Sequence, residues 1–149
     1  MRSTNHTYTT TMELLAWLED EWGQSVAPES ILVQIFDGSS EHERVSTILR
    51  IIKSYLPEAV IIGSSSSGEI IDGEVHDHTT LISISGFDST LLESFSTKGD
   101  SYEAGQCLAS SLINSDTKCI ILFVDGLDYG VERLLAGFHE GGGGETLLV

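Results

Sequence analysis

Four consecutive serines stand between two glycines near the middle of the chain, directly after a run of apolar residues. The segment reads Gly63-Ser64-Ser65-Ser66-Ser67-Gly68-Glu69. Hydroxyl groups donate and accept hydrogen bonds, and small side chains leave the backbone accessible. At the end of a predicted strand, these residues therefore predict one wall of a pocket for a small polar ligand. A loop with only a structural role is the alternative.

Two aspartates, each followed by glycine, end predicted strands elsewhere in the chain: Asp37 and Asp125. Such aspartates commonly cap the next helix or close a turn. Ligands of open α/β sheets bind beyond the carboxyl ends of the strands, so both residues join the predicted ligand site. The segments 33–38 and 122–126 resemble each other, which suggests two strand–Asp-Gly–helix units in one sheet.

Nucleophilic catalysis by a serine is an alternative function for the same loop. The loop lacks the Gly-x-Ser-x-Gly pattern, and no helix is predicted directly after it, as a nucleophile elbow requires. A hydrolase would have to activate Ser65 or Ser66 with His76 or His78. A nucleotide-binding loop is disfavoured because no Gly-Lys-Ser or Gly-Lys-Thr follows.

His76 and His78 could instead begin a metal site, because alternate residues of a strand point the same way. Asp72 and Glu74 add carboxylate oxygens nearby. Metal sites usually need a third convergent ligand, and the spacing places none. A polar turn at the surface is the alternative, and we assign no metal ligand.

The charge of the chain limits its partners. The 149 residues include 7 basic and 23 acidic side chains, a formal net charge of -16. Such a field repels nucleic acid and anionic membranes. Cys107 and Cys119 are too few for a disulfide framework, so we expect free, buried thiols and a cytoplasmic protein. No signal peptide or membrane-spanning segment is predicted.

Periodicity predicts an α/β fold, with α+β as the alternative, in which helices flank a mixed β-sheet. Residues 1–11 are expected to be a flexible tail and 12–149 a single domain. Thr11 is the expected N-cap of the first helix, and Ser40 and Glu43 have capping-box spacing before the second. The predicted helices cover 12–22, 41–55, 101–114 and 129–139. The predicted strands cover 31–36, 60–64, 69–71 with Val75 across an Asp72-Gly73 turn, 80–85, 90–97 and 118–124.

The last nine residues have an unusual composition. Gly141-Gly142-Gly143-Gly144 precedes Glu145-Thr146-Leu147-Leu148-Val149, a β-like run with no turn or partner strand after it. We expect a fragment of a longer protein, truncated at this end; a tail added to the native sequence is the alternative.

Several motifs in order resemble the N-terminal domain of the FIST family, the sensory domains of bacterial signal transduction. The most telling is the Gly-x-Ser-x-x-Gly-Glu-Ile pattern from Gly63 to Ile70. The resemblance runs from about residue 31 to residue 144. The other matching segments are Asp37-Gly38, 57–62, 72–75, 123–127 and 134–138.

The resemblance implies a non-catalytic module that binds a small molecule, such as an amino acid or a similar metabolite. The module would pass the signal to an attached or separate output protein. Some family members look like haem-based nitric oxide sensors, which keeps haem open as a cofactor, although no histidine here is assigned to it. A ligand-free interaction scaffold is a further alternative.

Overall fold

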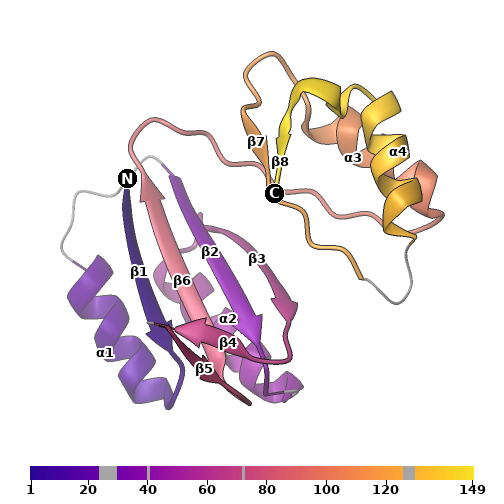
Figure 1. The fold of residues 1–149 in the computed structure, drawn as a ribbon. Helices are drawn as coiled ribbons and strands as arrows, with labels where there is room; N and C mark the ends of the chain where they lie inside the picture. Colours follow the sequence, from indigo (N-terminus) through magenta and orange to yellow (C-terminus); the bar gives the residue numbers. More distant parts are fainter. Residues whose placement is uncertain (24–29, 40, 72, 126–129) are drawn as a thin grey trace. The chain divides into compact units, whose positions relative to one another are not determined.

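Backbone contacts divide the chain into two units, Met1–Leu92 and Glu93–Val149. This computed structural model describes residues 1–23, 30–39, 41–71, 73–125 and 130–149 (Figure 1). The first unit holds the larger sheet and the second holds a helix pair with a small sheet. The prediction of a mixed α/β fold is confirmed. The prediction of one domain over 12–149 stays a prediction.

The first unit is built on a four-stranded mixed sheet. In spatial order its strands are β1 (Arg2–Thr7), β6 (Thr80–Phe87), β2 (Ser30–Asp37) and β3 (Val60–Ser65). The β1–β6 and β6–β2 pairs are antiparallel, whereas β2 and β3 are parallel and are joined by a helix. Four consecutive elements of this unit were therefore predicted correctly in kind, from β2 to β4.

Helices α1 (Thr11–Trp22) and α2 (His42–Tyr55) supply the apolar cover of one sheet face (Figure 1). Because side chains alternate along a strand, the odd-numbered residues of β2 and the even-numbered residues of β6 face these helices. Thr10, not the predicted Thr11, caps α1, since its hydroxyl accepts from the backbone N–H of Glu13. The buried core consists of Leu14, Leu18, Trp22, Val33, Ile35, Ile48, Ile51, Ile52, Ala59, Ile82 and Ile84.

The expectation of a flexible tail over residues 1–11 is wrong. Arg2–Thr7 forms the edge strand β1, which pairs with β6 from Arg2 opposite Gly86 to Thr7 opposite Leu81. The inward side chains are polar, so apolar alternation was absent from the sequence. Thr4 instead accepts a 3.0 Å hydrogen bond from the indole of Trp22, and His6 stacks on Trp17.

A short antiparallel hairpin follows β3 in the chain. It consists of β4 (Glu69–Ile71) and β5 (Glu74–His76), with Ile70 opposite Val75. The predicted pairing is confirmed. Asp72 of the predicted turn lies outside the described residues, and so does Ser40 of the predicted capping box.

The second unit packs α3 (Ser101–Leu112) against α4 (Val131–Glu140) with direct backbone contact. A Cβ at Gly105 would lie 2.0 Å from the carbonyl oxygen of Leu134, and one at Gly137 would lie 2.0 Å from that of Tyr102. Glycine is therefore required at both positions. The buried core of this unit consists of Ala104, Leu108, Ala109, Ile120, Leu134 and Phe138.

The strand predicted at 118–124 is much shorter than expected. β7 covers Cys119–Ile120 and pairs in parallel with β8 (Leu147–Leu148). The C-terminal run therefore pairs with a strand that precedes it in the chain. Only one face of β7 is covered, because Ile120 is buried whereas Cys119 is exposed. Within the described residues, β7 and β2 lie in different sheets, and Asp125 lies beyond the end of β7. The expectation of two strand–Asp-Gly–helix units in one sheet is therefore wrong.

Glycines 141–144 are part of the packing of the second unit. A Cβ at Gly143 would lie 2.2 Å from the ring of Phe138, and Gly142 has a φ of 110°. Residues 143–145 form a 3₁₀ turn, η1 (Gly143–Glu145), that leads into β8. The glycine run is therefore part of an ordered turn between α4 and β8.

Two further expectations differ from the structure. The strand predicted at 90–97 is absent, since these residues have no ladder partner among those described and Leu91 is 83% exposed. Strand propensity without a neighbouring strand is not sufficient. Both cysteines are free as expected, but Cys119 is exposed rather than buried. None of the described helices is both long enough and apolar enough to span a membrane.

Candidate functional site

Asp37 is the last residue of β2, and its carboxylate collects hydrogen bonds from neighbouring segments. Its Oδ1 accepts hydrogen bonds from the hydroxyls of Ser39 and Thr80, each at 2.6 Å, and from the backbone N–H of Ser39 at 3.3 Å. Burial opposes ionisation, but these donors and the nearby Arg44 outweigh it and lower the pKa of Asp37. Asp37 is thus an ionised acceptor for protein groups, as an Asx-type turn requires.

Glu69 forms a second carboxylate centre beside the first. The residue is only 4% exposed. Its Oε1 accepts from the hydroxyl of Ser66 at 2.9 Å, and its Oε2 accepts from the hydroxyl of Thr79. Because hydrogen bonds to an ionised acceptor are stronger than neutral ones, Glu69 ties the start of β4 to the residue that precedes β6. We call Glu69, Ser66 and Thr79 the clamp.

Backbone hydrogen bonds join the clamp to the end of β2. The N–H of Gly38 donates to the carbonyl of Thr79 at 2.8 Å, and the N–H of Ser66 donates to the carbonyl of Asp37 at 2.9 Å. A Cβ at Gly38 would lie 3.2 Å from a carboxylate oxygen of Glu69. The serine loop therefore lies against the first Asp-Gly corner, as predicted.

Glycines of the serine motif have structural roles. A Cβ at Gly63 would lie 2.3 Å from the carbonyl oxygen of Ile35, so glycine lets β3 approach β2. One at Gly68 would lie 2.9 Å from a carboxylate oxygen of Asp77. The N–H of Gly68 also donates to the Ser66 hydroxyl at 2.9 Å. The motif thus fixes where the chain leaves the four-stranded sheet after β3 and enters β4.

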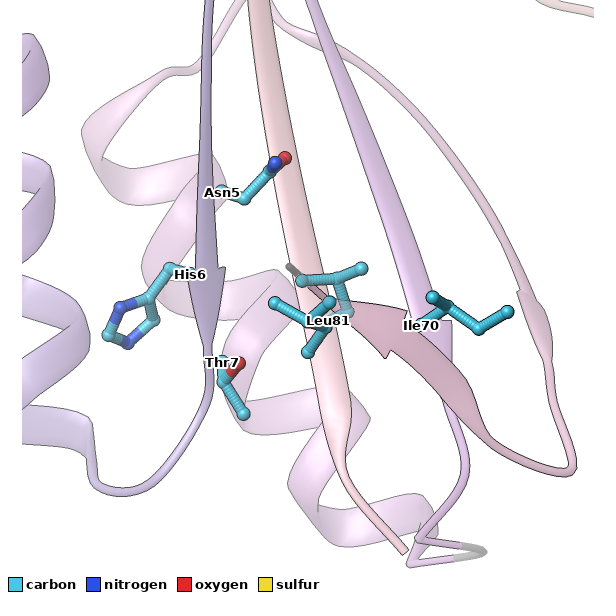
Figure 2. Close-up of a pocket in the computed structure, with 6 residues that line it drawn as sticks. Asn5, His6, Thr7, Ile70 and Leu81 are labelled. Carbon is cyan, nitrogen blue, oxygen red and sulfur yellow. The ribbon is translucent and has the colours of Figure 1, made fainter. Parts of the chain in front are cut away.

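An open hollow of about 360 Å³ lies where the hairpin meets the sheet (Figure 2). It is lined by Asn5, His6, Thr7, Ile70, Ile71 and Leu81. Figure 2 shows the His6 ring directed away from Asn5, on the side of α1, where it stacks on Trp17. By strand alternation, Asn5 and Thr7 share the opposite face, away from the helices. The hollow therefore belongs to the sheet face that α1 and α2 leave uncovered.

The predicted site residues divide into four groups. Asp37, Ser66 and Glu69 come together, but their hydrogen bonds are to protein groups. Ser65 and Ser67 are exposed, and their hydroxyls make no hydrogen bond to other described residues. Asp125 belongs to the second unit, so its joining the Asp37 corner stays a prediction. The hydroxyl of Ser64, at the end of β3, donates to the carbonyl of Ser65.

The structure gives no support to a serine hydrolase. Within the described part of the chain, no serine of the loop is hydrogen-bonded to an imidazole, and the Ser66 hydroxyl lies 2.9 Å from both Glu69 and the carbonyl of Gly68. A nucleophile needs an adjacent base. The described residues also hold no group of three or more metal-ligating side chains around His76 and His78.

Haem does not fit the hollow. A haem iron needs an axial side chain, commonly the imidazole of histidine. The histidine that lines the hollow, His6, turns its ring toward α1 (Figure 2). Its Nε2 is buried and has no hydrogen-bond partner among the described residues. Burial lowers the pKa of His6 despite the opposing charge of Glu13.

Sequence reasoning missed the N-terminal wall of the hollow. Asn5 and Thr7 were assigned to a tail, and Leu81 was counted only as a strand residue. Residues 2–7 are all polar and show no alternation, so the sequence carries no strand signal there. Ile70 and Ile71 directly follow the recognised motif, so their position beside the site could have been inferred.

Comparison with protein families identifies the chain. The model of the FIST N domain matches residues 31–149. No curated protein and no solved structure matches the chain. The matched range includes the clamp, the hairpin and Leu81, whereas β1 precedes it.

Proposed function

We propose that this chain, which belongs to the FIST N domain family over residues 31–149, binds a small molecule and reports its presence to a signalling partner. FIST N domains are sensory domains found in signal transduction proteins and are generally non-catalytic. The observation that carries the proposal is the hollow on the uncovered sheet face, beside the family motif.

The clamp supports this proposal because it positions a wall of the hollow. Glu69 is held by Ser66 and Thr79, and the next two residues, Ile70 and Ile71, line the hollow. Ser66 and Glu69, which were predicted to contact the ligand, thus act by positioning the hairpin. Ser65 and Ser67, which are exposed, remain proposed ligand contacts. Asp125 of the second unit also remains a proposed ligand contact.

The hairpin also offers a route for the signal. Ile70 is 74% exposed and Val75, directly opposite, is 71% exposed. If the hairpin can adopt more than one position relative to β1, a ligand that contacts both shifts the population toward the position that it binds more tightly. A partner or attached output domain that contacts Ile70 and Val75 would then respond to the ligand. We propose that the protein acts in the cytoplasm of a bacterium.

A thermal-shift screen tests the proposal. Amino acids, other small metabolites and haem are added singly to the protein. A ligand at 100 times its Kd stabilises the unit by about 2.7 kcal/mol, which raises the Tm by roughly 10–20 °C for a unit of this size. Hydrogen exchange then locates the protected segment. If no compound in a broad collection raises the Tm, a ligand-free scaffold that docks through the hairpin becomes the better interpretation.

A further inference from the structure

We propose that the hollow takes uncharged small molecules that combine an aliphatic part with an amide or hydroxyl group, and that it rejects carboxylates. This inference rests on the proposed function and specifies the ligand class of the same site. It follows from the side chains that line the hollow and from the distribution of basic residues in the first unit.

The lining of the hollow separates into an apolar side and a hydrogen-bonding side. Ile70 and Ile71 of the hairpin and Leu81 of β6 are aliphatic. Asn5 and Thr7 of β1 each carry groups that donate and accept hydrogen bonds. Neither side chain bonds to another described residue, so both keep these groups for a ligand. Amides and alcohols match this pairing, because they too donate and accept.

An anion finds no counter-charge at the hollow. The first unit has four basic side chains: Arg2, Arg44, Arg50 and Lys53. Arg2 pairs with Glu21 and Arg44 with Glu41, while Lys53 donates to the carbonyls of Pro57 and Ala59. Arg50 lies on α2, the helix that covers the other face of the sheet.

Acidic groups strengthen the rejection of anions. The chain carries a net charge of -16, and exposed Glu74 lies opposite Ile71 in the hairpin. Removing a carboxylate from water without a paired cation is costly, and the surrounding field adds repulsion. A cationic ligand would be attracted by this field, but the described residues of the lining offer an ammonium group no carboxylate.

Three compounds with one carbon skeleton test the ligand class: isovaleramide, isovalerate and isoamylamine. We expect isovaleramide to shift the backbone amide NMR signals of β1 and the hairpin, with a Kd of roughly a millimolar for so few atoms. Isovalerate should cause no saturable shift at the same concentrations. Isoamylamine should bind at least about tenfold more weakly than the amide once salt screens the acidic field.

Matched variants locate the binding. Thr7→Val removes one hydroxyl without changing the shape of the side chain, and Asn5→Asp replaces the amide by a carboxylate. Each should weaken isovaleramide binding about fivefold or more, since one hydrogen bond is lost. Ser3→Ala is the control on the same strand, because Ser3 bonds to Ser85 and does not line the hollow.

Several results would overturn the inference. They are equal binding of isovalerate and isovaleramide, stronger binding of the amine at high salt, absence of any amide response, and insensitivity of amide binding to both β1 variants. Each of these results overturns only the ligand class, because the proposed function stands if the metabolite screen yields a ligand that binds outside the hollow. A screen without any ligand, in contrast, removes the proposed function itself.

Discussion

The clamp makes a quantitative prediction about how the hairpin is held. Glu69 is 4% exposed and accepts from Thr79 and Ser66. A hydrogen bond to a charged acceptor contributes about 1.5–3 kcal/mol. Ser66 keeps the carbonyl of Gly68 at 2.9 Å as another acceptor, whereas the Thr79 hydroxyl has no other acceptor among the described residues. The Thr79 bond should therefore carry most of the coupling.

A double-mutant cycle isolates this bond. Glu69→Ala alone mixes lost hydrogen bonds with relief from burying a charge, so its single effect is ambiguous. In the double-mutant cycle of Glu69→Ala with Thr79→Val, the free energy gained by no longer burying the charge cancels. We expect a coupling free energy of about 1.5–3 kcal/mol. The matched cycle with Ser85→Ala should be additive to within about 0.5 kcal/mol, because Ser85 bonds to Ser3.

Urea unfolding followed by tryptophan fluorescence is a suitable assay. Trp17 and Trp22 are the 2 tryptophans of the chain, and both lie on α1. The fluorescence change therefore reports the first unit alone. Hydrogen exchange of residues 69–76 should also rise more than that of α2 in Glu69→Ala. A coupling energy below about 0.5 kcal/mol between Glu69 and Thr79 would refute the role assigned to the clamp.

Three further predictions concern packing and pH. Gly137→Ala should destabilise the second unit by about 2 kcal/mol or more despite the better helix propensity of alanine, because its Cβ would lie 2.0 Å from the carbonyl oxygen of Tyr102. Hydrogen exchange of α3 and α4 measures this loss of stability. Ala136→Ser, at an exposed position of the same helix, is the control. Burial lowers the pKa of His6 from 6.5, so the unfolded chain gains the proton first and the free energy of unfolding should fall as the pH drops below that value. His6→Phe should abolish this fall in urea titrations at several pH values, and an unchanged pH profile would contradict the reasoning. The pKa of Asp37 is lowered from 3.8, so its stabilisation is complete above that pH and is lost below it; Asp37→Asn should flatten the acid limb of the same profile.

Elements with a regular apolar period were predictable from the sequence. α2, β2 and β6 bury Ile48, Val33 and Ile84 at the expected spacing. The edge strand β1 was not predictable, because its inward contacts are a His6–Trp17 stack and a Thr4–Trp22 hydrogen bond. Those contacts depend on α1 being in place, and they leave no apolar pattern in residues 2–7.

The same distinction applies to the candidate site. The serine loop was located from composition, and its contact with the Asp37 corner results from the parallel pairing of β2 with β3. The sequence alone could not show that Ser66 bonds to Glu69 rather than facing a ligand. Burial of a carboxylate depends on which hydroxyls the fold brings to it, and Thr79 arrives from a separate segment.

The ordered glycine turn near the C-terminus affects how this domain should be trimmed or fused. Its appearance in the sequence invites a cut after α4 or the attachment of a tag by replacing the turn. Such a truncation would expose the Phe138 ring that Gly143 contacts and would leave β7 without its partner strand. Fusion proteins and crystallisation variants should therefore keep residues 141–149 intact and place any junction beyond them.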